Sequence, residues 1–152
     1  MGKIAENREA DLVQHLNVAL QDIIYKDDKS PLHEVKGIFI TTERNDEQAF
    51  LVRSLSGPIA TFSLAELPGC CGVLVSYHSE VLEKYRKQGL GTALLQVRMM
   101  AARASRYGCL MATVDKTNTA ETEILIKTGW IKMKEFRNPR TSNVIEVYST
   151  NL

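Results

Sequence analysis

The sequence predicts an α/β fold in which one mixed, mostly antiparallel sheet is flanked by helices on both faces. Three observations support this. Apolar residues at helical spacing fill two long segments, short runs with strand character lie between them, and a strand–helix–strand succession follows the second helix. At 152 residues the chain has the size of one domain, so we expect residues 1–152 to form a single folded unit.

The first half of the chain predicts one helix followed by a meander of strands. Apolar residues recur at helical spacing from about Glu6 to Tyr25, after a segment, Lys3 to Ala5, that could form only a very short strand. A charged loop, Lys26 to Pro31, comes next. Three strands separated by turns at residues 43–47 and 56–58 are then expected: Val35 to Thr42, Ala49 to Leu55 and Ile59 to Leu64.

The second half alternates strands and helices. After a turn at residues 67–69, an apolar run from Cys70 to about Val81 predicts a strand, and a long helix is expected from the glycines at 89 and 91 to Gly108. The arginines of this helix, Arg98, Arg103 and Arg106, are expected on its solvent face. The remaining elements are a strand at Leu110 to Val114, a helix opened by Asn118 and ended by Gly129, and strands at Trp130 to Phe136 and Val144 to Tyr148.

Composition excludes several classes of function. Apolar residues make up 44% of the chain, charged ones 24%, and the formal net charge is +1, so a nucleic acid is not expected as a partner. No apolar run is long enough to cross a membrane, and the N-terminus lacks the apolar core of a secretory signal, so we expect a cytoplasmic protein. Cys70, Cys71 and Cys109 have neither metal-ligand spacing nor a disulfide pattern, and no metal is expected.

The loop from Arg86 to Thr92 is the strongest candidate for a binding site. Its two glycines, Gly89 and Gly91, lie where a basic segment runs into the long amphipathic helix. The first N–H groups of a helix have no partners within it, and glycine allows the backbone to approach a phosphate closely. The spacing therefore favours a diphosphate ligand, although two glycines before a helix can also form a plain tight turn. It matches neither the dinucleotide-binding fingerprint nor the P-loop.

Two segments in order carry a resemblance to a known family. Arg86-Lys87-Gln88-Gly89-Leu90-Gly91 resembles the acyl-CoA-binding motif of the GNAT N-acetyltransferase superfamily. About thirty residues later, Asn118 and then Lys127-Thr128-Gly129-Trp130 resemble that superfamily's next segment. The predicted order of helices and strands is similar to the GNAT fold along nearly the whole chain, whereas the specific motifs cover about Val81 to Trp130.

The resemblance implies an acetyl-CoA-dependent N-acetyltransferase with acetyl-CoA as the acyl donor. An acetyl group would pass directly to a primary amine within one ternary complex. A strand bulge around Val81 would offer a backbone N–H to the reacting oxygen, and Val81 would contact the pantetheine. The expected cofactor-binding residues are Val81, Arg86, Lys87, Gln88, Gly89, Leu90, Gly91, Thr92 and Asn118.

The chemistry also needs a base, because an ammonium group has no lone pair with which to attack. Tyr77, His78 and Glu80 on the strand before the loop are the candidates, and the sequence leaves open which of them faces the acceptor. Period-two alternation places His78 and Glu80 on one face unless a bulge resets it. Many family members have a tyrosine that protonates the departing thiolate, and here Leu125 occupies its position.

The acceptor itself is not specified by the sequence. The resemblance assigns acceptor choice to Leu12 to Pro31 and to the turn at Arg137 to Asn143, and implies a small-molecule or protein amine. An exposed last strand could pair across a homodimer. Because Leu125 replaces the usual tyrosine, a non-catalytic CoA-binding or regulatory module with the same fold is the alternative function.

Overall fold

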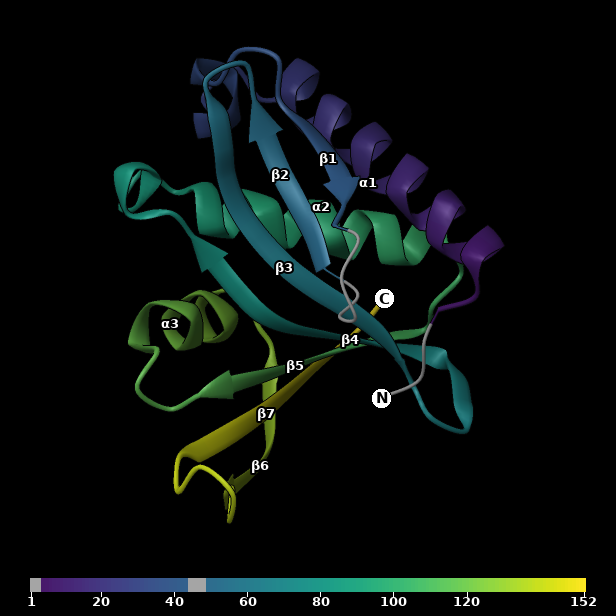
Figure 1. The fold of residues 1–152 in the computed structure, drawn as a ribbon, viewed down its shortest axis with the longest axis vertical. Helices are drawn as coiled ribbons and strands as arrows, with labels where there is room; N and C mark the ends of the chain where they lie inside the picture. Colours follow the sequence, from purple (N-terminus) through teal and green to yellow (C-terminus); the bar gives the residue numbers. More distant parts are fainter. Residues whose placement is uncertain (1–3, 44–48) are drawn as a thin grey trace.

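The computed structural model describes residues 4–43 and 49–152, whose strands form one seven-stranded sheet in the order β1-β2-β3-β4-β5-β7-β6 (Figure 1). All neighbouring strands are antiparallel except β4 and β5, which are parallel. The expected mixed, mostly antiparallel sheet is thereby confirmed. The strands are β1 (Phe39–Thr42), β2 (Ala49–Ser54), β3 (Gly57–Leu67), β4 (Cys70–Val81), β5 (Cys109–Asp115), β6 (Ile131–Arg137) and β7 (Val144–Asn151).

Two long helices pack against each other along the sheet. The first, α1 (Glu6–Lys26), ends within one residue of the prediction, and α2 (Leu90–Ala104) follows the glycine loop. Figure 1 shows α1 and α2 side by side, and they share many close residue pairs. A shorter helix, α3 (Thr119–Lys127), follows β5 and contacts α2. Two 3₁₀ turns, η1 (Pro31–Glu34) and η2 (Glu83–Tyr85), complete the helical structure that is described.

One apolar core lies between the helices and the sheet. The buried residues of α1 follow the predicted helical period, and they meet fully buried phenylalanines, Phe50 and Phe62, whose stacked rings lie 5.5 Å apart. A polar clamp fixes α1 to the edge strand, because Asn17 Nδ2 donates to the Ile40 carbonyl at 2.9 Å while the Ile40 N–H donates to Asn17 Oδ1 at 2.8 Å. This satisfies backbone groups of an edge strand that would otherwise lack partners.

The sheet opens between its two parallel strands. β4 pairs with β5 only from Val73 to Ser76, opposite Cys109 to Ala112, although β4 continues to Val81 and β5 to Asp115. The ends of the two strands therefore diverge (Figure 1). The N-termini of α2 and α3 follow these diverging ends, so the loops that carry the sequence motifs meet at the opening.

The second half of β4 contains a bulge. Tyr77 pairs with Ser63 and Glu80 with Thr61, so two residues of β4, His78 and Ser79, oppose one residue of β3. His78 adopts a left-handed backbone with φ +50°, which is uncommon outside glycine. The bulge expected around Val81 thus lies slightly earlier, and it resets the alternation of side chains along the strand.

Several predicted boundaries are wrong. The first strand begins at Phe39 rather than Val35, because Gly37 turns the chain with φ +64°. The long helix ends at Ala104 instead of Gly108, since Arg106 adopts φ +66° and the Gly108 N–H donates to the Gly72 carbonyl. Ile4 and Ala5 form no strand, whereas Lys3 and most of the predicted turn at 43–47 lie outside the described residues.

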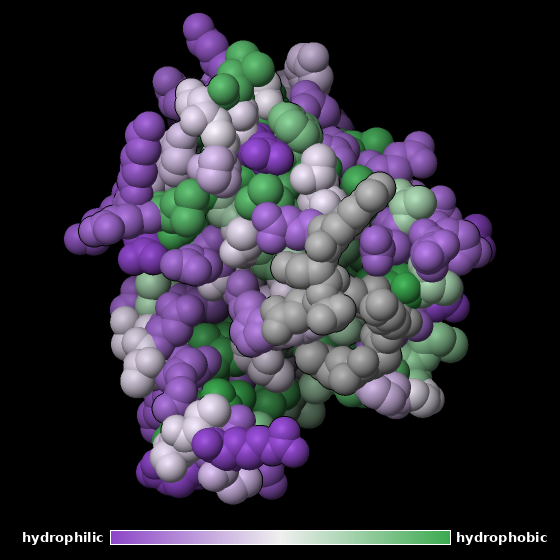
Figure 2. All heavy atoms as spheres, in the orientation of Figure 1, coloured by the Kyte–Doolittle hydropathy of each residue, from purple (hydrophilic) through white to green (hydrophobic). Residues whose placement is uncertain are grey.

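The visible face of the protein is mixed in polarity (Figure 2). Figure 2 shows polar side chains over much of the visible face, with apolar ones in small groups between them. In the described part of the chain, no helix is long and apolar enough to cross a membrane. Within the same residues, no group of histidine, cysteine and acidic side chains could hold a metal ion.

The packing of α3 can be tested with two adjacent residues. Leu125 is fully buried and Ile126 is 60% exposed, so Leu125→Ala should lower the free energy of unfolding by about 2–5 kcal/mol and Ile126→Ala by at most about 0.5 kcal/mol. Urea unfolding followed by circular dichroism measures both. Equal losses would contradict the assignment of Leu125 to the core.

Candidate functional site

The loop before α2 presents a row of unused N–H groups. Lys87 and Gly89 are both left-handed, with φ of +61° and +79°, and α2 begins at Leu90. From Lys87 to Thr92, no backbone N–H donates to another residue that the structure describes. Consecutive N–H groups in such a turn form a concave anion-binding surface, and the helix dipole adds positive potential there. Lys87, Gln88 and Gly89 are exposed, so a ligand can reach them.

Side chains of the loop hold it in place. Arg86 Nε donates to the Val81 carbonyl at 2.8 Å and Nη2 to Glu80 Oε1 at 3.2 Å, which ties the loop to the end of β4. Gln88 Nε2 donates to the Lys84 carbonyl at 3.3 Å. Of the predicted cofactor-binding residues, Arg86 and Gln88 therefore use their side chains to shape the loop. The Arg86 N–H donates to the Glu83 carbonyl, whereas the Gln88 N–H remains available.

Gly91 allows α2 and α3 to approach each other. A Cβ atom at Gly91 would lie 3.0 Å from Ile124 Cδ1, which is tighter than ordinary contact. The start of α3 is fixed by Asn118, whose Oδ1 accepts from the Glu121 N–H at 3.3 Å, as the sequence predicts. Asn118 is exposed and follows the end of β5, so it lies across the opening from the glycine loop.

The three predicted bases lie on or beside the bulge. Tyr77 and His78 have their rings 4.9 Å apart in an edge-to-face arrangement, and the His78 side chain is exposed. Glu80 is exposed as well and forms the ion pair with Arg86. Of the three, Glu80 lines the small pocket beside α2, whereas Tyr77 and His78 do not.

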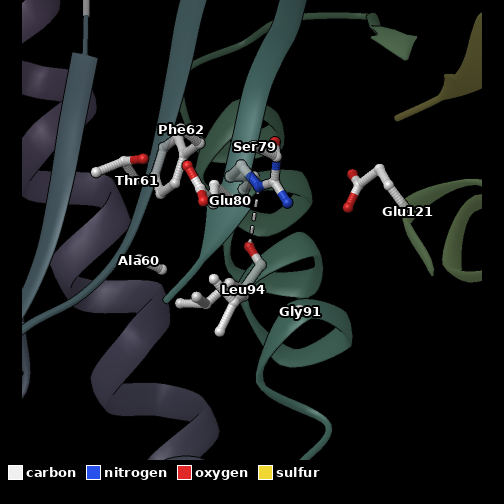
Figure 3. A pocket seen from close by; sticks show the side chains of 10 residues that line it. Ala60, Thr61, Phe62, Ser79, Glu80, Gly91, Leu94 and Glu121 are labelled. Carbon is white, nitrogen blue, oxygen red and sulfur yellow. Dashed lines mark hydrogen bonds between the residues drawn. The ribbon is translucent and has the colours of Figure 1, made fainter. Parts of the chain in front are cut away.

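That pocket, of about 30 Å³, is lined by residues of β3, β4, α2 and α3. Figure 3 shows Ser79 and Glu80 of β4, Leu94 of α2 and, facing them from the other side, Glu121 of α3. The complete lining is Ala60, Thr61, Phe62, Ser79, Glu80, Val81, Gly91, Leu94, Arg98 and Glu121. Two predicted cofactor-binding residues, Val81 and Gly91, are among them.

Sequence reasoning missed Arg98, which it placed on the solvent face. Arg98 is 3% exposed and its guanidinium lies over the Phe62 ring, 5.0 Å from the centroid. Burial lowers the pKa of Arg98, while the negative charge of Glu121 acts in the opposite direction. A signal was present, because Arg98 follows Leu94 by four residues and precedes Ala101 by three, which places it within the apolar stripe of the helix.

Tyr148 does not take the place of the tyrosine that Leu125 replaces. Leu125 is fully buried in the core, and Tyr148 is buried with its hydroxyl donating to Glu146 Oε2 at 2.6 Å. Burial, together with that hydrogen bond, raises the pKa of Tyr148 to about 12. Tyr85 is half-buried, and the Lys84 ammonium lies 5.4 Å from the centroid of the Tyr85 ring. Tyr148 thus acts as a structural anchor of β7.

Comparisons with known proteins agree with this geometry. No curated protein sequence matches the chain. The model of the acetyltransferase (GNAT) family matches residues 13–130. Among solved structures, a GNAT family acetyltransferase from Elizabethkingia anophelis with acetyl-CoA bound is similar, with a TM-score of 0.64 and 14% identity, over 76% of this chain and 99% of that chain.

Two further structures share the fold at similar identity. A putative acetyltransferase from Salmonella typhimurium with its cofactor acetyl-CoA has a TM-score of 0.59 and 13% identity, over 70% of this chain and 65% of that chain. The ribosomal-protein-S18-alanine N-acetyltransferase from Escherichia coli has a TM-score of 0.58 and 15% identity, over 72% and 71%.

The polar cluster around Tyr148 predicts a pH-dependent contribution to stability. The Tyr148 hydroxyl and the Lys132 ammonium, 3.0 Å from Glu146 Oε1, lower the pKa of the buried Glu146 carboxyl. Its stabilising effect is therefore complete above the unfolded pKa of about 4.3 and lost as pH falls through the lower folded pKa. Glu146→Gln should cost about 1–3 kcal/mol at pH 7.

The difference between wild type and Glu146→Gln should shrink steadily below about pH 4.3, as measured by urea unfolding at a series of pH values. Exposed Glu123, on α3, supplies the control Glu123→Gln. A wild-type advantage that grows on acidification would contradict the assignment.

Proposed function

Because this chain belongs to the GNAT acetyltransferase family, we propose that it transfers an acetyl group from acetyl-CoA directly to a primary amine within a ternary complex. The family match over residues 13–130 supports the acyl donor, and similar structures contain acetyl-CoA. A small-molecule amine or the amine of a protein would be the acceptor. The E. coli N-acetyltransferase of similar fold acts on a ribosomal protein, which makes a protein acceptor a reasonable candidate.

The observation that carries this proposal is the row of unused N–H groups from Lys87 to Thr92. These N–H groups can bind the two negative charges of a diphosphate in the conformation that the loop already has, and the positive end of the α2 dipole adds to the attraction. The left-handed conformation of Lys87, which costs on the order of 1 kcal/mol outside glycine, also supports a functional role for this loop.

The opening between β4 and β5 fits the rest of the donor. Beyond Ser76, β4 has no pairing with β5, so the backbone groups on that edge of β4 can bind an extended chain by strand-like hydrogen bonds. A chain that begins at the glycine loop and follows this edge passes Val81 and reaches the bulge at His78 and Ser79. The thioester would then lie beside the small pocket.

The reaction needs a proton acceptor near that point. An amine with a pKa near 10.4 is mostly protonated at pH 7, so it must lose one proton before its nitrogen attacks the acetyl carbon. Glu80 lines the pocket, and its carboxylate can take this proton directly or through water. The thiolate that leaves has a pKa of about 8.5 in water and can be protonated by solvent.

The alternative is a non-catalytic module that binds CoA. Its support is the fully buried Leu125 at the position where many family members have a tyrosine. Binding of acetyl-CoA without transfer to any member of a library of small amines and peptide N-termini would favour this module over the enzyme.

A charge placed in the first turn of α2 tests the diphosphate site. Thr92→Glu should weaken acetyl-CoA binding about tenfold or more in calorimetry, because the carboxylate repels the phosphates at short range, while the same carboxylate is favourable for the helix itself. Gln96→Glu, one turn later on the exposed face, is the matched control and should change affinity less than about threefold. No measurable binding of acetyl-CoA to the wild type would refute the proposed function.

The base is tested by removing one carboxylate at a time. Glu80→Gln should lower kcat for acetyl transfer by about 10²–10⁴-fold, because the carboxylate accepts the amine's proton. Glu83→Gln removes a neighbouring exposed carboxylate and should leave kcat within about twofold. Full activity of Glu80→Gln combined with a large loss in His78→Gln would assign the role to His78 instead.

A further inference from the structure

The buried guanidinium of Arg98 interacts with residues of four elements, β3, β4, α2 and α3. Nη1 donates to Ser76 Oγ at 2.7 Å and to Ser79 Oγ at 2.6 Å, on either side of the bulge at His78. Nε donates to the Leu94 carbonyl at 3.3 Å, the Phe62 ring lies below the group, and Glu121 attracts it across the pocket. A long flexible side chain is thereby fixed in one position.

These contacts leave one nitrogen unused. Nε has one hydrogen and Nη1 has two, and all three are donated, whereas Nη2 donates to no residue that the structure describes. Arg98 lines the small pocket. Among the described residues, Trp130 Nε1 is the one fully buried side-chain nitrogen or oxygen that lacks a hydrogen-bond partner. Nη2 of Arg98, which also lacks a partner, is therefore not fully buried and is accessible at the pocket. A fixed pair of N–H donors is therefore available at the pocket.

The charge of Arg98 is not neutralised by a salt bridge. No carboxylate within the described residues lies at ion-pair distance from it, and Glu121 acts only from the far side of the pocket. A buried cation without a direct partner gains most from a negative charge that appears next to it, because the surroundings screen poorly. In the proposed reaction, such a charge appears on the acyl oxygen.

We propose that Arg98 is a catalytic residue whose Nη2 hydrogen-bonds the carbonyl oxygen of the bound acetyl group and stabilises the oxyanion formed there. This inference rests on the proposed function. The bulge, which Arg98 itself holds through Ser76 and Ser79, is where an extended donor bound along β4 brings its thioester. One side chain would then both shape the strand and complete the set of donors to the reacting oxygen.

The electrons and protons of the step balance as follows. The lone pair of the neutral amine forms the new N–C bond, and the carbonyl π pair moves to oxygen, where Arg98 Nη2 donates to it. When that pair returns, the C–S bond breaks and coenzyme A leaves as a thiolate. The amide nitrogen passes its extra proton through water to this thiolate, while the base keeps the proton that it took from the ammonium, so the products are an amide and free coenzyme A.

Infrared spectroscopy of bound [1-¹³C]acetyl-CoA tests the hydrogen bond without an acceptor amine. In the wild type, the labelled carbonyl band should lie at lower frequency than that of an equally labelled small thioester, S-ethyl thioacetate, in an apolar solvent, because Nη2 polarises the C=O bond. In Arg98→Met most of that shift should disappear. Arg103→Met removes an exposed arginine from the same helix and should keep the wild-type band.

Kinetics and binding complete the test. Arg98→Met should lower kcat for acetyl transfer by about 10²–10³-fold, with affinity for free coenzyme A changed less than about threefold. Arg98→Lys should recover part of kcat. The double variant Ser76→Ala/Ser79→Ala retains the cation and should therefore lose less activity than Arg98→Met.

The inference would be overturned by an unshifted carbonyl band in the wild type, or by the same band in wild type and Arg98→Met. In either case, binding of coenzyme A would still support the proposed function. Absence of coenzyme A binding by the wild type would overturn both. If Arg98→Met does not fold, the band of Arg98→Gln decides. This neutral side chain polarises a carbonyl less than a guanidinium does, so a band at the wild-type frequency would leave Arg98 with a structural role.

Discussion

The short pairing of β4 with β5 is the constraint on which the site depends. The two parallel strands share hydrogen bonds over four residues, and each then continues alone, so the sheet must open at the carboxyl ends of its only parallel pair among the described strands. Ligands of α/β proteins commonly bind at such a place, because helix N-termini and free backbone groups converge there. Here the opening places the loop before α2 opposite the loop before α3.

The part of β4 beyond Ser76 has lost its β5 neighbour and needs other contacts to stabilise it. It is held on one side by β3, despite the bulge, and underneath by Arg98, whose guanidinium joins Ser76 and Ser79. At its end, Arg86 ties the glycine loop back to Val81 and Glu80. Polar contacts, buried or partly buried at Arg98 and exposed at Arg86, thus fix the strand where it has lost its neighbour.

Much of this could be predicted from the sequence, because the signals were local. Helical spacing gave α1 to within one residue, the apolar run from Cys70 to Val81 matched β4, and Asn118 with Gly129 marked the ends of α3. The glycine loop was also visible, since a left-handed turn before a helix depends on neighbours in the chain. The role of each predicted site residue stays a proposal.

Other features could not be read from the chain. The predicted helix end at Gly108 was wrong because Gly108 forms a hydrogen bond with Gly72, which is distant in the chain. The predicted solvent exposure of Arg98 was wrong because its guanidinium binds side chains of β4. The sequence by itself determined the order of elements and the glycine loop before α2, whose conformations depend on adjacent residues. Only the tertiary structure decided where the strands part, which β4 side chains face the pocket and that a buried arginine lies beside it, because each depends on contacts between residues far apart in the chain.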